Sequence, residues 1–381
     1  MNYRDFQRTM PEAAVHFQRN RSLWSYTHLD LILLLLLLLL AGYGLFVFYS
    51  ASGQSLAAVE RQLVRYAVAL VVMVAVACVD PRILRRAAPW LFAAGLMLLM
   101  AVLLVGVGAK GAQRWLQLPG LPRFQPSEVM KLIVPMTLAW FFAEKPLPPS
   151  LRHIGVILGL MALPVLLIAK QPDLGTALLI ASSGIFVILL SGILWRYVLG
   201  AAALAAACGP LLWMGMRDYQ RQRVLTFLNP ESDPLGAGWN IIQSKTAIGS
   251  GGIYGKGWLN GTQSQLDFLP ESHTDFIIAV LAEELGLVGV LALLTLYLCI
   301  VARGLYIAAN AQDTFGRLLA GSLSLTFFVY VFVNIGMVSG ILPVVGVPLP
   351  LVSFGGTSIV TLLAGFGIIM SIHTHRTMVT R

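Results

Sequence analysis

The sequence predicts an all-α polytopic membrane protein of about ten transmembrane helices, with a large extracytoplasmic loop between helices 7 and 8. Hydrophobic residues make up 57% of the 381 residues, charged residues make up only 11%, and the mean hydropathy is +0.80. A soluble domain carries about 25% charged residues. This chain has too little charge to cover a water-exposed surface, so a lipid bilayer must solvate much of it.

The predicted spans are apolar stretches that approach or reach the roughly 17–25 residues needed to cross a bilayer. The stretch 128–143 is short, and 153–169 joins 173–192 through a tight turn. The first stretch lacks a small-residue cleavage site and is expected to be an uncleaved signal anchor. The stretches lie near 29–49, 63–79, 88–107, 128–143, 153–169, 173–192, 195–214, 276–302, 317–340 and 352–372.

The distribution of basic residues predicts the orientation of the chain. Ten spans place both termini on one side, and the basic N-terminus and basic short loops indicate the cytoplasm. We therefore expect a cytoplasmic N-terminal segment (1–28), a single transmembrane domain (29–375) and a cytoplasmic tail (376–381). The longest loop, about 215–274, is too long for a passive connector and should carry function on the opposite side.

The net charge of +9 has a membrane explanation. In a soluble protein it would suggest nucleic acid, but here basic residues anchor helix ends and set topology, so no nucleic-acid partner is expected. Cys78, Cys208 and Cys299 lie in apolar runs and show no metal-ligand spacing. They therefore say nothing about the redox compartment.

Four predicted spans begin, on the extracytoplasmic side, with polar residues and proline. Helix N-termini present free backbone N–H groups, and several directed at one place favour an anionic ligand. Each start considered alone is explained better as a cap of its own helix. Together, they favour an anion site at this face. The starts are Arg123 to Glu128, Gln171 to Asp173, Pro270 to Asp275, and Pro348 to Thr357.

Asp275 is the strongest single candidate for a catalytic residue. A general base must be ionised and able to accept a proton, and the first turn of a helix keeps a carboxylate ionised. The alternative is a capping box, because Ser272 precedes Asp275 by three positions. The residues alone slightly favour the cap.

Glu128 and Lys131 lie three residues apart and therefore share a helix face. Charged side chains inside a span are costly and usually functional, so we expect an ion pair that lines a polar cavity. The pattern leaves open whether the pair binds substrate or braces the helix. Arg123 and Arg114 precede it and could bind phosphate, although snorkelling to the headgroups explains each equally well.

The large loop supplies further candidates. Arg221 and Lys245 could neutralise a diphosphate. Glu271 and His273 shortly precede Asp275 and are further substrate-binding candidates. For any one arginine, a solvated charged loop is the simpler explanation. At least one of the adjacent pair Glu283–Glu284 should face protein or water rather than lipid.

Nucleotide-binding signatures are missing from the sequence. There is no P-loop and no GxGxxG that opens a helix after a strand, and the cytoplasmic side has no segment large enough for ATP or a nucleotide sugar. If the protein is an enzyme, no nucleotide is expected as cofactor. Its substrate then arrives already activated, through the bilayer.

Long motifs in these regions resemble the SEDS family (shape, elongation, division and sporulation), which includes RodA and FtsW. They cover nearly every span after the second and the whole large loop, and the segments around Ser339 and His373 resemble the RodA branch. The matching segments are Lys110 to Trp115, Arg123 to Glu128, Gln171 to Thr176, Asp233 to Gly238, Gln243 to Lys245, Gly255 to Gly257, Phe268 to Glu284 and Pro343 to Gly356.

The resemblance implies a peptidoglycan glycosyltransferase that polymerises lipid II, an undecaprenyl-pyrophosphate disaccharide-pentapeptide, for cell elongation. The family's essential aspartate maps onto Asp275, and its glutamate and lysine on the fourth helix map onto Glu128 and Lys131. This mapping moves the preference for Asp275 from cap to general base or ligand of a divalent cation, Mg²⁺ or Mn²⁺. Implied partners are a class B penicillin-binding protein and other elongation-complex membrane proteins.

Two rival functions fit the same residues. A lipid II flippase would also need a polar site among the helices. A non-catalytic scaffold of the elongation machinery would need only surfaces for its partners. Catalysis is favoured over a scaffold because charged groups at several converging helix ends are costly for a passive protein.

Overall fold

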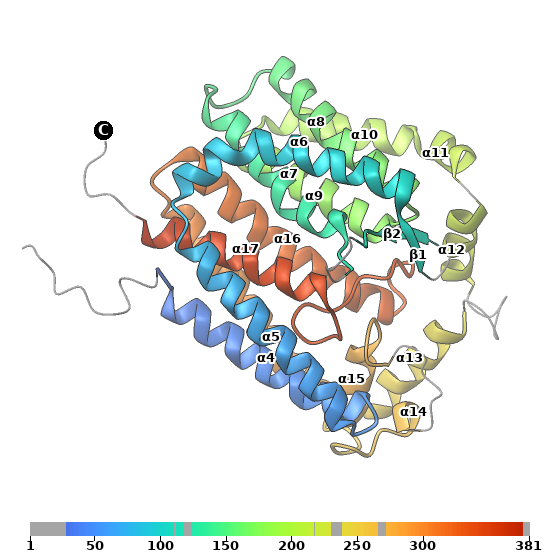
Figure 1. Ribbon diagram of the computed structural model, residues 1–381. Coiled ribbons are helices and arrows are strands. Elements are labelled where there is room, and N and C mark those ends of the chain that lie inside the picture. Colours follow the sequence, from blue (N-terminus) through green and yellow to red (C-terminus); the bar gives the residue numbers. More distant parts are fainter. Residues whose placement is uncertain are drawn as a thin grey trace, which may run out of the picture.

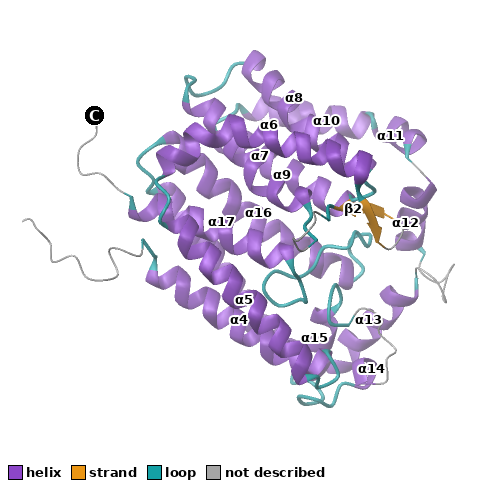
Figure 2. Cartoon of the chain, in the orientation of Figure 1, coloured by secondary structure: helices purple, strands orange, loops and turns teal. Residues whose placement is uncertain are grey.

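A computed structural model shows a bundle of long helices (Figures 1 and 2). It describes residues 28–109, 112–117, 123–216, 218–229, 238–265 and 272–375. The helices are α4 (Leu31–Ala51), α5 (Leu56–Ala77), α6 (Pro81–Val105), α7 (Pro126–Ala143), α8 (Leu151–Lys170), α9 (Leu174–Leu190), α10 (Trp195–Ala207), α11 (Gly209–Gly215), α12 (Asp218–Leu228), α13 (Trp239–Gly251), α14 (Thr262–Gln265), α15 (Ile277–Ala309), α16 (Thr314–Val338) and α17 (Thr357–Thr374).

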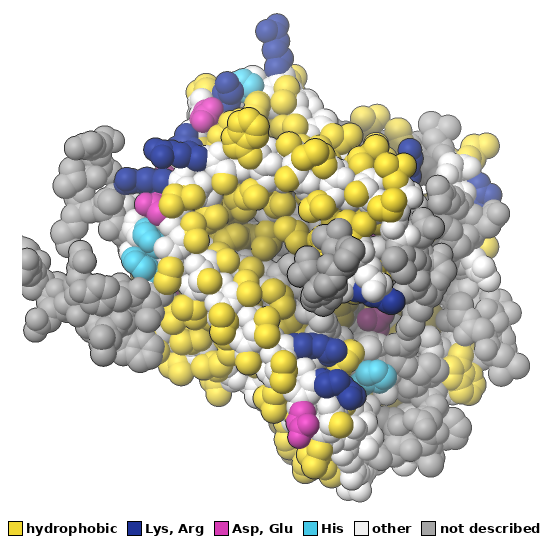
Figure 3. Space-filling view, in the orientation of Figure 1, with side chains coloured by type: hydrophobic (Ala, Val, Ile, Leu, Met, Phe, Trp, Pro, Cys, Tyr) yellow, Lys and Arg dark blue, Asp and Glu magenta, His cyan; other side chains and the backbone are white. Residues whose placement is uncertain are grey.

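Every predicted span lies on helix, which confirms the all-α polytopic prediction. The seventh stretch is divided at Cys208 into α10 and α11. Six helices of the described part are long and apolar enough to cross a membrane, by length and composition. Apolar side chains cover most of the face seen in Figure 3, as expected for a surface in contact with lipid.

The arrangement of the helices divides the bundle into a packed centre and a thin edge. In the centre, α17 lies along α5, and α16 packs against α15, α9 and α7. At the edge, α10 has no buried residue. The charged pair that the sequence places on α7 is therefore carried by a central helix, where packing can hold it in place.

The predicted loop near 108–127 contains strands that the sequence analysis did not predict. Strand β1 (Val107–Ala109) pairs antiparallel with β2 (Ala112–Trp115), and Leu116 forms a bridge to Phe124. These pairings return the chain to the start of α7. They fix the approach to Pro126, whose missing N–H suits the first turn of a helix.

Helix α15 is broken at Gly286, where φ is 65° and ψ is −162°. The loop after α13 fills the break: Leu287 N–H donates to the Gly252 carbonyl, and Gly257 N–H donates to the Glu284 carbonyl, both at 3.0 Å. A Cβ at Gly286 would lie 2.3 Å from the Gly255 nitrogen, so glycine is required. The long loop is thereby attached to the helix that follows Asp275.

Two adjacent carboxylates strengthen this attachment. Glu283 is fully buried and accepts hydrogen bonds from Lys256 Nζ at 2.6 Å and from the Thr262 hydroxyl at 2.9 Å. Glu284 accepts one from the Ser50 hydroxyl at 2.5 Å. Both side chains face protein, which confirms the expectation that at least one of them avoids lipid.

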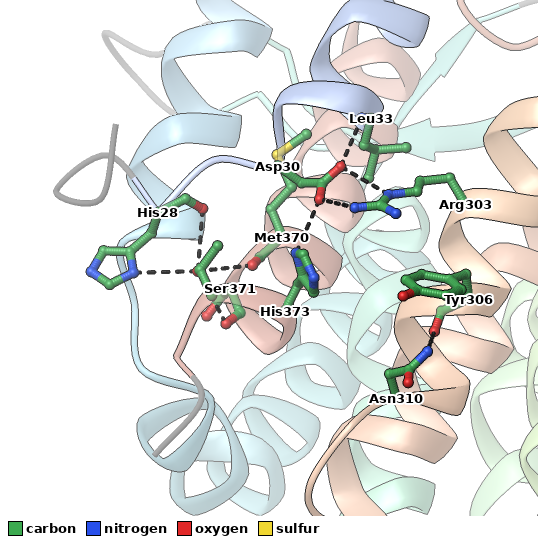
Figure 4. Close-up of polar contacts among 10 residues, drawn as sticks. His28, Asp30, Leu33, Arg303, Tyr306, Asn310, Met370, Ser371 and His373 are labelled. Atoms are coloured by element: carbon green, nitrogen blue, oxygen red, sulfur yellow. Dashed lines mark hydrogen bonds and ion pairs between the residues drawn. The ribbon is translucent and has the colours of Figure 1, made fainter. Parts of the chain in front are cut away.

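A charged cluster joins three helices at the end of the bundle where α4 begins and α17 ends (Figure 4). Asp30 caps α4 by accepting from Leu33 N–H at 2.8 Å. It also pairs with Arg303 of α15 at 2.6 Å and with His373 of α17 at 3.0 Å. Burial alone would raise the pKa of the Asp30 carboxyl, but hydrogen bonds from His373, Arg303 and Leu33 outweigh it and hold that pKa well below its usual range.

Replacing this carboxylate should destabilise the protein in a pH-dependent way. A lowered folded-state pKa adds stability that is complete above the unfolded pKa of about 3.9 and is lost as the pH falls towards the folded value. We expect Asp30→Asn to lower the thermal unfolding midpoint at neutral pH, with the gap to wild type narrowing below about pH 4. Tryptophan fluorescence of the detergent-solubilised protein measures both midpoints.

Asp80→Asn is the matched control for Asp30→Asn. Asp80 caps α6 by accepting from Arg82 N–H at 2.8 Å, and the described residues give it no ion pair. The difference in unfolding midpoint between Asp30→Asn and wild type could stay constant down to pH 3, or it could only equal the difference for Asp80→Asn. Either result would contradict a contribution of ion pairing to stability.

Candidate active site

The turn before α15 is held by backbone contacts to the segment that leads into α17. Ser353 Oγ donates to the Thr274 carbonyl at 2.5 Å, and Phe354 N–H donates to the His273 carbonyl at 2.9 Å. Asn334 of α16 donates to the carbonyls of Asp275 at 2.9 Å and Val347 at 2.8 Å. We call residues 272–275 and 345–358 together the wall.

The wall also binds neighbouring helices. Tyr66 of α5 donates to the Leu351 carbonyl and Tyr297 of α15 donates to the Pro350 carbonyl, both at 2.6 Å. Buried hydroxyl and amide groups thus satisfy the carbonyls of an irregular segment inside an apolar bundle, as the absence of water there requires. The wall is a fixed element on which a reactive group can be held.

Asp275 is half-buried at the start of α15. Its Oδ2 atom lies 3.6 Å from the position that a Cβ on Gly346 would take, and Gly346 has a φ of 74°. The carboxylate therefore faces Gly346, whose positive φ favours glycine. Asn334 holds the backbone carbonyl of Asp275, so this anchor of the turn does not depend on the Asp275 side chain.

Glu128 and Lys131 form the buried ion pair that the sequence predicts. Their Nζ–Oε1 distance is 2.6 Å, and each side chain is 8% exposed. Thr361 of α17 donates to the second Glu128 oxygen at 3.1 Å. Lys131 Nζ lies 5.0 Å from the centre of the Tyr330 ring. The pair thus connects α7 to α16 and α17.

A cavity of about 180 Å³ brings these groups together. We call it the Glu128 cavity. Its lining includes Gly346, which Asp275 faces, so the aspartate lies at its edge. The charged and polar lining residues are Arg114, Gln125, Glu128, Lys131, Asp173, Thr176, Tyr330, Thr357 and Ser358.

Asp173 and Arg114 add two further charges to the lining of the Glu128 cavity. Asp173 caps α9 by accepting from Thr176 N–H at 3.2 Å, and it also accepts from Gln125 Nε2 at 2.8 Å. Arg114 lies 3.9 Å from Asp173 and donates to the carbonyls of Gln171 and Pro172. The sequence signal for Asp173 was its place in one of the four polar helix starts.

The remaining basic candidates lie outside the lining of the Glu128 cavity. Arg123 is exposed and donates to Gln117 Oε1 at 3.0 Å. Arg221 donates to the Trp213 and Met214 carbonyls at 3.1 and 2.6 Å, at the end of α11. Lys245 on α13 is exposed.

The Lys245 side chain packs over Gly340, with Nζ 2.7 Å from the position of an added Cβ. Glu271 lies outside the described residues. His273 is exposed and lines a second cavity on the other side of the wall.

The described part of the chain contains no cluster of three or more His, Cys, Asp or Glu side chains that could hold a metal ion. Mg²⁺ usually binds through one or two carboxylates together with substrate phosphates, rather than in a cage made only of protein. A single carboxylate such as Asp275 fits that mode when a diphosphate supplies the other ligands.

Fold and site together define a polytopic membrane protein with a polar, charge-lined cavity at one end of its helix bundle and an aspartate at the cavity edge. Residues 30–378 match the FtsW/RodA/SpoVE family of cell cycle proteins, and the chain belongs to this family.

The chain is 59% identical over 362 residues to peptidoglycan glycosyltransferase MrdB of Escherichia coli (strain K12), which covers 95% of this chain and 98% of that protein. It is 38% identical over 355 residues to a probable peptidoglycan glycosyltransferase FtsW of Trichlorobacter lovleyi, with coverage of 90% and 92%.

Two solved structures resemble the whole fold. The crystal structure of the rod shape determining protein RodA of Thermus thermophilus superposes with a TM-score of 0.69 at 30% identity, covering 91% of this chain and 96% of that one. A chain from a study of structural coordination of polymerization and crosslinking by a peptidoglycan synthase complex superposes with a TM-score of 0.81 at 32% identity, covering 92% and 99%.

Proposed function

We propose that this protein is a peptidoglycan glycosyltransferase that polymerises lipid II for cell elongation. The relative named MrdB, at 59% identity over nearly the full length, supports the reaction class. The observation that carries the proposal is the Asp275 carboxylate at the edge of a charge-lined cavity in an otherwise apolar bundle. Charged groups placed inside a membrane bundle are costly unless they serve a function.

In the proposed orientation, the end of the bundle that carries the wall faces the periplasm. The opposite end carries Asp30, His373 and the start of α6, where Arg82, Arg85 and Arg86 follow one another. An excess of arginine in short loops is typical of the cytoplasmic side. Lipid II would then reach the Glu128 cavity from the outer leaflet, and both termini would be cytoplasmic.

The proposed reaction joins two lipid-linked sugars. The C4 hydroxyl oxygen of the acceptor attacks C1 of the donor sugar, the bond from C1 to the diphosphate oxygen breaks, and Asp275 takes the hydroxyl proton. The α-linked donor gives a β-linked product, so the transfer inverts C1. General base catalysis of this kind contributes about 10²–10⁴ to a rate. Loss of the diphosphate makes the step favourable without a nucleotide.

Within this proposal, the Glu128 cavity binds a sugar head group. Glu128 and Asp173 can accept hydrogen bonds from sugar hydroxyls, while Arg114 and Lys131 can donate to carbonyl and hydroxyl oxygens of the sugar. Arg123, Arg221, Lys245, Glu271 and His273 remain candidates for contacts to the rest of the substrate. A divalent cation held by Asp275 and the diphosphate would supply positive charge for the leaving group.

We further propose that the chain works beside a class B penicillin-binding protein, which crosslinks the new strand, and with other elongation-complex membrane proteins. The similar chain from a study of a peptidoglycan synthase complex supports this partnership.

The test is a polymerisation assay with the purified full-length protein and purified lipid II in vesicles. We expect glycan polymer to appear, with products resolved by gel after enzymatic labelling. Lipid II that crosses the bilayer without forming polymer would favour the flippase. Polymer that forms only from an added polymerase would favour the scaffold, and either result would contradict the proposal.

A further inference from the structure

A second cavity, of about 540 Å³, lies on the other side of the wall from the Glu128 cavity. We call it the Arg61 cavity. It lies between the α4–α5 connection and the turn before α15, and its lining includes Ser52, Ser55, Arg61, Ser272, His273 and Phe354. His273 is only two residues from Asp275, so one short turn borders both cavities.

The two cavities differ in charge. Two cations and two carboxylates line the Glu128 cavity, namely Arg114, Lys131, Glu128 and Asp173, and the Asp275 carboxylate adjoins them. That cavity is therefore neutral or negative overall. Among the described residues, the lining of the Arg61 cavity includes Arg61 and His273 but no aspartate or glutamate.

A second arginine increases the positive charge beside the Arg61 cavity. Arg65 lies one helical turn after Arg61 on α5, and its guanidinium carbon is 4.0 Å from the centre of the Phe354 ring that lines the cavity. Its Nη1 atom is buried without a hydrogen-bond partner in the described part of the chain. Figure 3 shows basic side chains and a histidine gathered over this part of the surface.

Neither arginine has a carboxylate partner among the described residues. Like charges four residues apart on a helix repel each other, and a buried N–H group without an acceptor is costly. An anion in the cavity would relieve both costs. Ser55, which caps the N-terminus of α5, adds the positive end of a helix dipole to the same cavity.

We infer that the Arg61 cavity binds the diphosphate of a polyprenyl-linked sugar, and that the Glu128 cavity binds carbohydrate. This inference rests on the proposed function, because both substrates of that reaction carry a diphosphate. Lys131 is neutralised by Glu128 at 2.6 Å. Arg61, by contrast, lines its cavity with no ion pair to a described carboxylate, and Arg65 Nη1 has no hydrogen-bond partner among the described residues, so both can donate to phosphate oxygens. The wall, with Asp275 and His273 two residues apart, lies between the two sites.

The test measures the affinity of the full-length protein, in nanodiscs of neutral lipid, for farnesyl diphosphate. Losing charge-assisted hydrogen bonds to an anion weakens binding by about 10- to 100-fold. We expect this loss in Arg61→Gln/Arg65→Gln, and a matching rise in KM for lipid II. Arg85→Gln removes one arginine charge near the start of α6, beside Glu144 and at the opposite end of the bundle from the Arg61 cavity, and should bind the probe as wild type does.

One further variant and two competitor compounds test whether the cavity recognises the diphosphate itself. Arg61→Lys/Arg65→Lys keeps the charge and should restore most of the affinity, which separates charge from loss of packing on Phe354. Farnesol, without phosphates, should not compete. Phosphatidylglycerol in the nanodisc should compete weakly; if it displaces the probe as well as lipid II does, the cavity is a phospholipid headgroup site and the inference fails.

Unchanged affinity in the Arg61→Gln/Arg65→Gln protein, when it elutes and melts as wild type does, would also overturn the inference. Asp275→Asn keeps the diphosphate site and the catalytic residue separate, since in buffer without divalent cations it should bind the probe as wild type does. If it binds the probe and makes no polymer while the arginine variant also binds normally, the diphosphate site is wrong and the proposed reaction stands.

Discussion

Asp275→Asn should abolish polymer formation from lipid II, with a rate loss of about 10²–10⁴. The amide cannot accept the proton of the attacking hydroxyl. The fold should persist, because three backbone carbonyls of the turn, those of His273, Thr274 and Asp275, accept hydrogen bonds from Phe354, Ser353 and Asn334, and the substitution leaves these bonds in place. The measurement is the initial polymerisation rate, together with the thermal unfolding midpoint of the same preparation.

Two comparison variants test whether the loss of rate is specific to Asp275. Asp313→Asn makes the same change in an exposed residue before α16, at the opposite end of the bundle, and should leave the rate unchanged. Gly346→Ala should slow the reaction, since a side chain is strained at a φ of 74° and its Cβ would lie 3.6 Å from the Asp275 carboxylate. Polymerisation by Asp275→Asn at the wild-type rate would exclude Asp275 as the base.

Glu128→Gln should have the second large effect, on stability as well as activity. It leaves the Lys131 ammonium buried without its counter-charge, and breaking a buried ion pair costs about 3–5 kcal/mol of unfolding free energy. Lys131→Met should be similarly destabilising, because it leaves the Glu128 carboxylate with Thr361 as its remaining side-chain donor among the described residues. Thermal unfolding in detergent and the lipid II assay are measured on each variant.

The double variant Glu128→Gln/Lys131→Met separates bracing from substrate binding. Replacing both charges of a buried pair with neutral groups is often close to neutral for stability. We expect the unfolding midpoint to recover while polymerisation stays low, since the cavity has lost two groups that bind sugar. Recovery of both would show that the pair only braces α7 against α17.

The sequence by itself determined the helical spans and the polar residues at which several of them begin. A bilayer requires a continuous apolar run whose backbone hydrogen bonds close within the segment, so each span is visible locally. The Glu128–Lys131 pair was also predictable, because residues three apart on a helix face the same side. Asp275 became the preferred base only through the family resemblance, since on the residues alone its spacing from Ser272 slightly favours a cap.

Only the tertiary structure decided which of these groups meet. Asp275 faces Gly346, 71 positions later in the chain, and Asp173 meets Arg114 and Gln125 from two other segments. In the sequence, Arg61 and Arg65 are only two arginines at the edge of an apolar stretch. That no described carboxylate pairs with them, although the wall packs beside α5, is visible only in the tertiary structure. Helix formation depends on neighbours along the chain, whereas the charge of a cavity depends on side chains brought together by packing of distant segments.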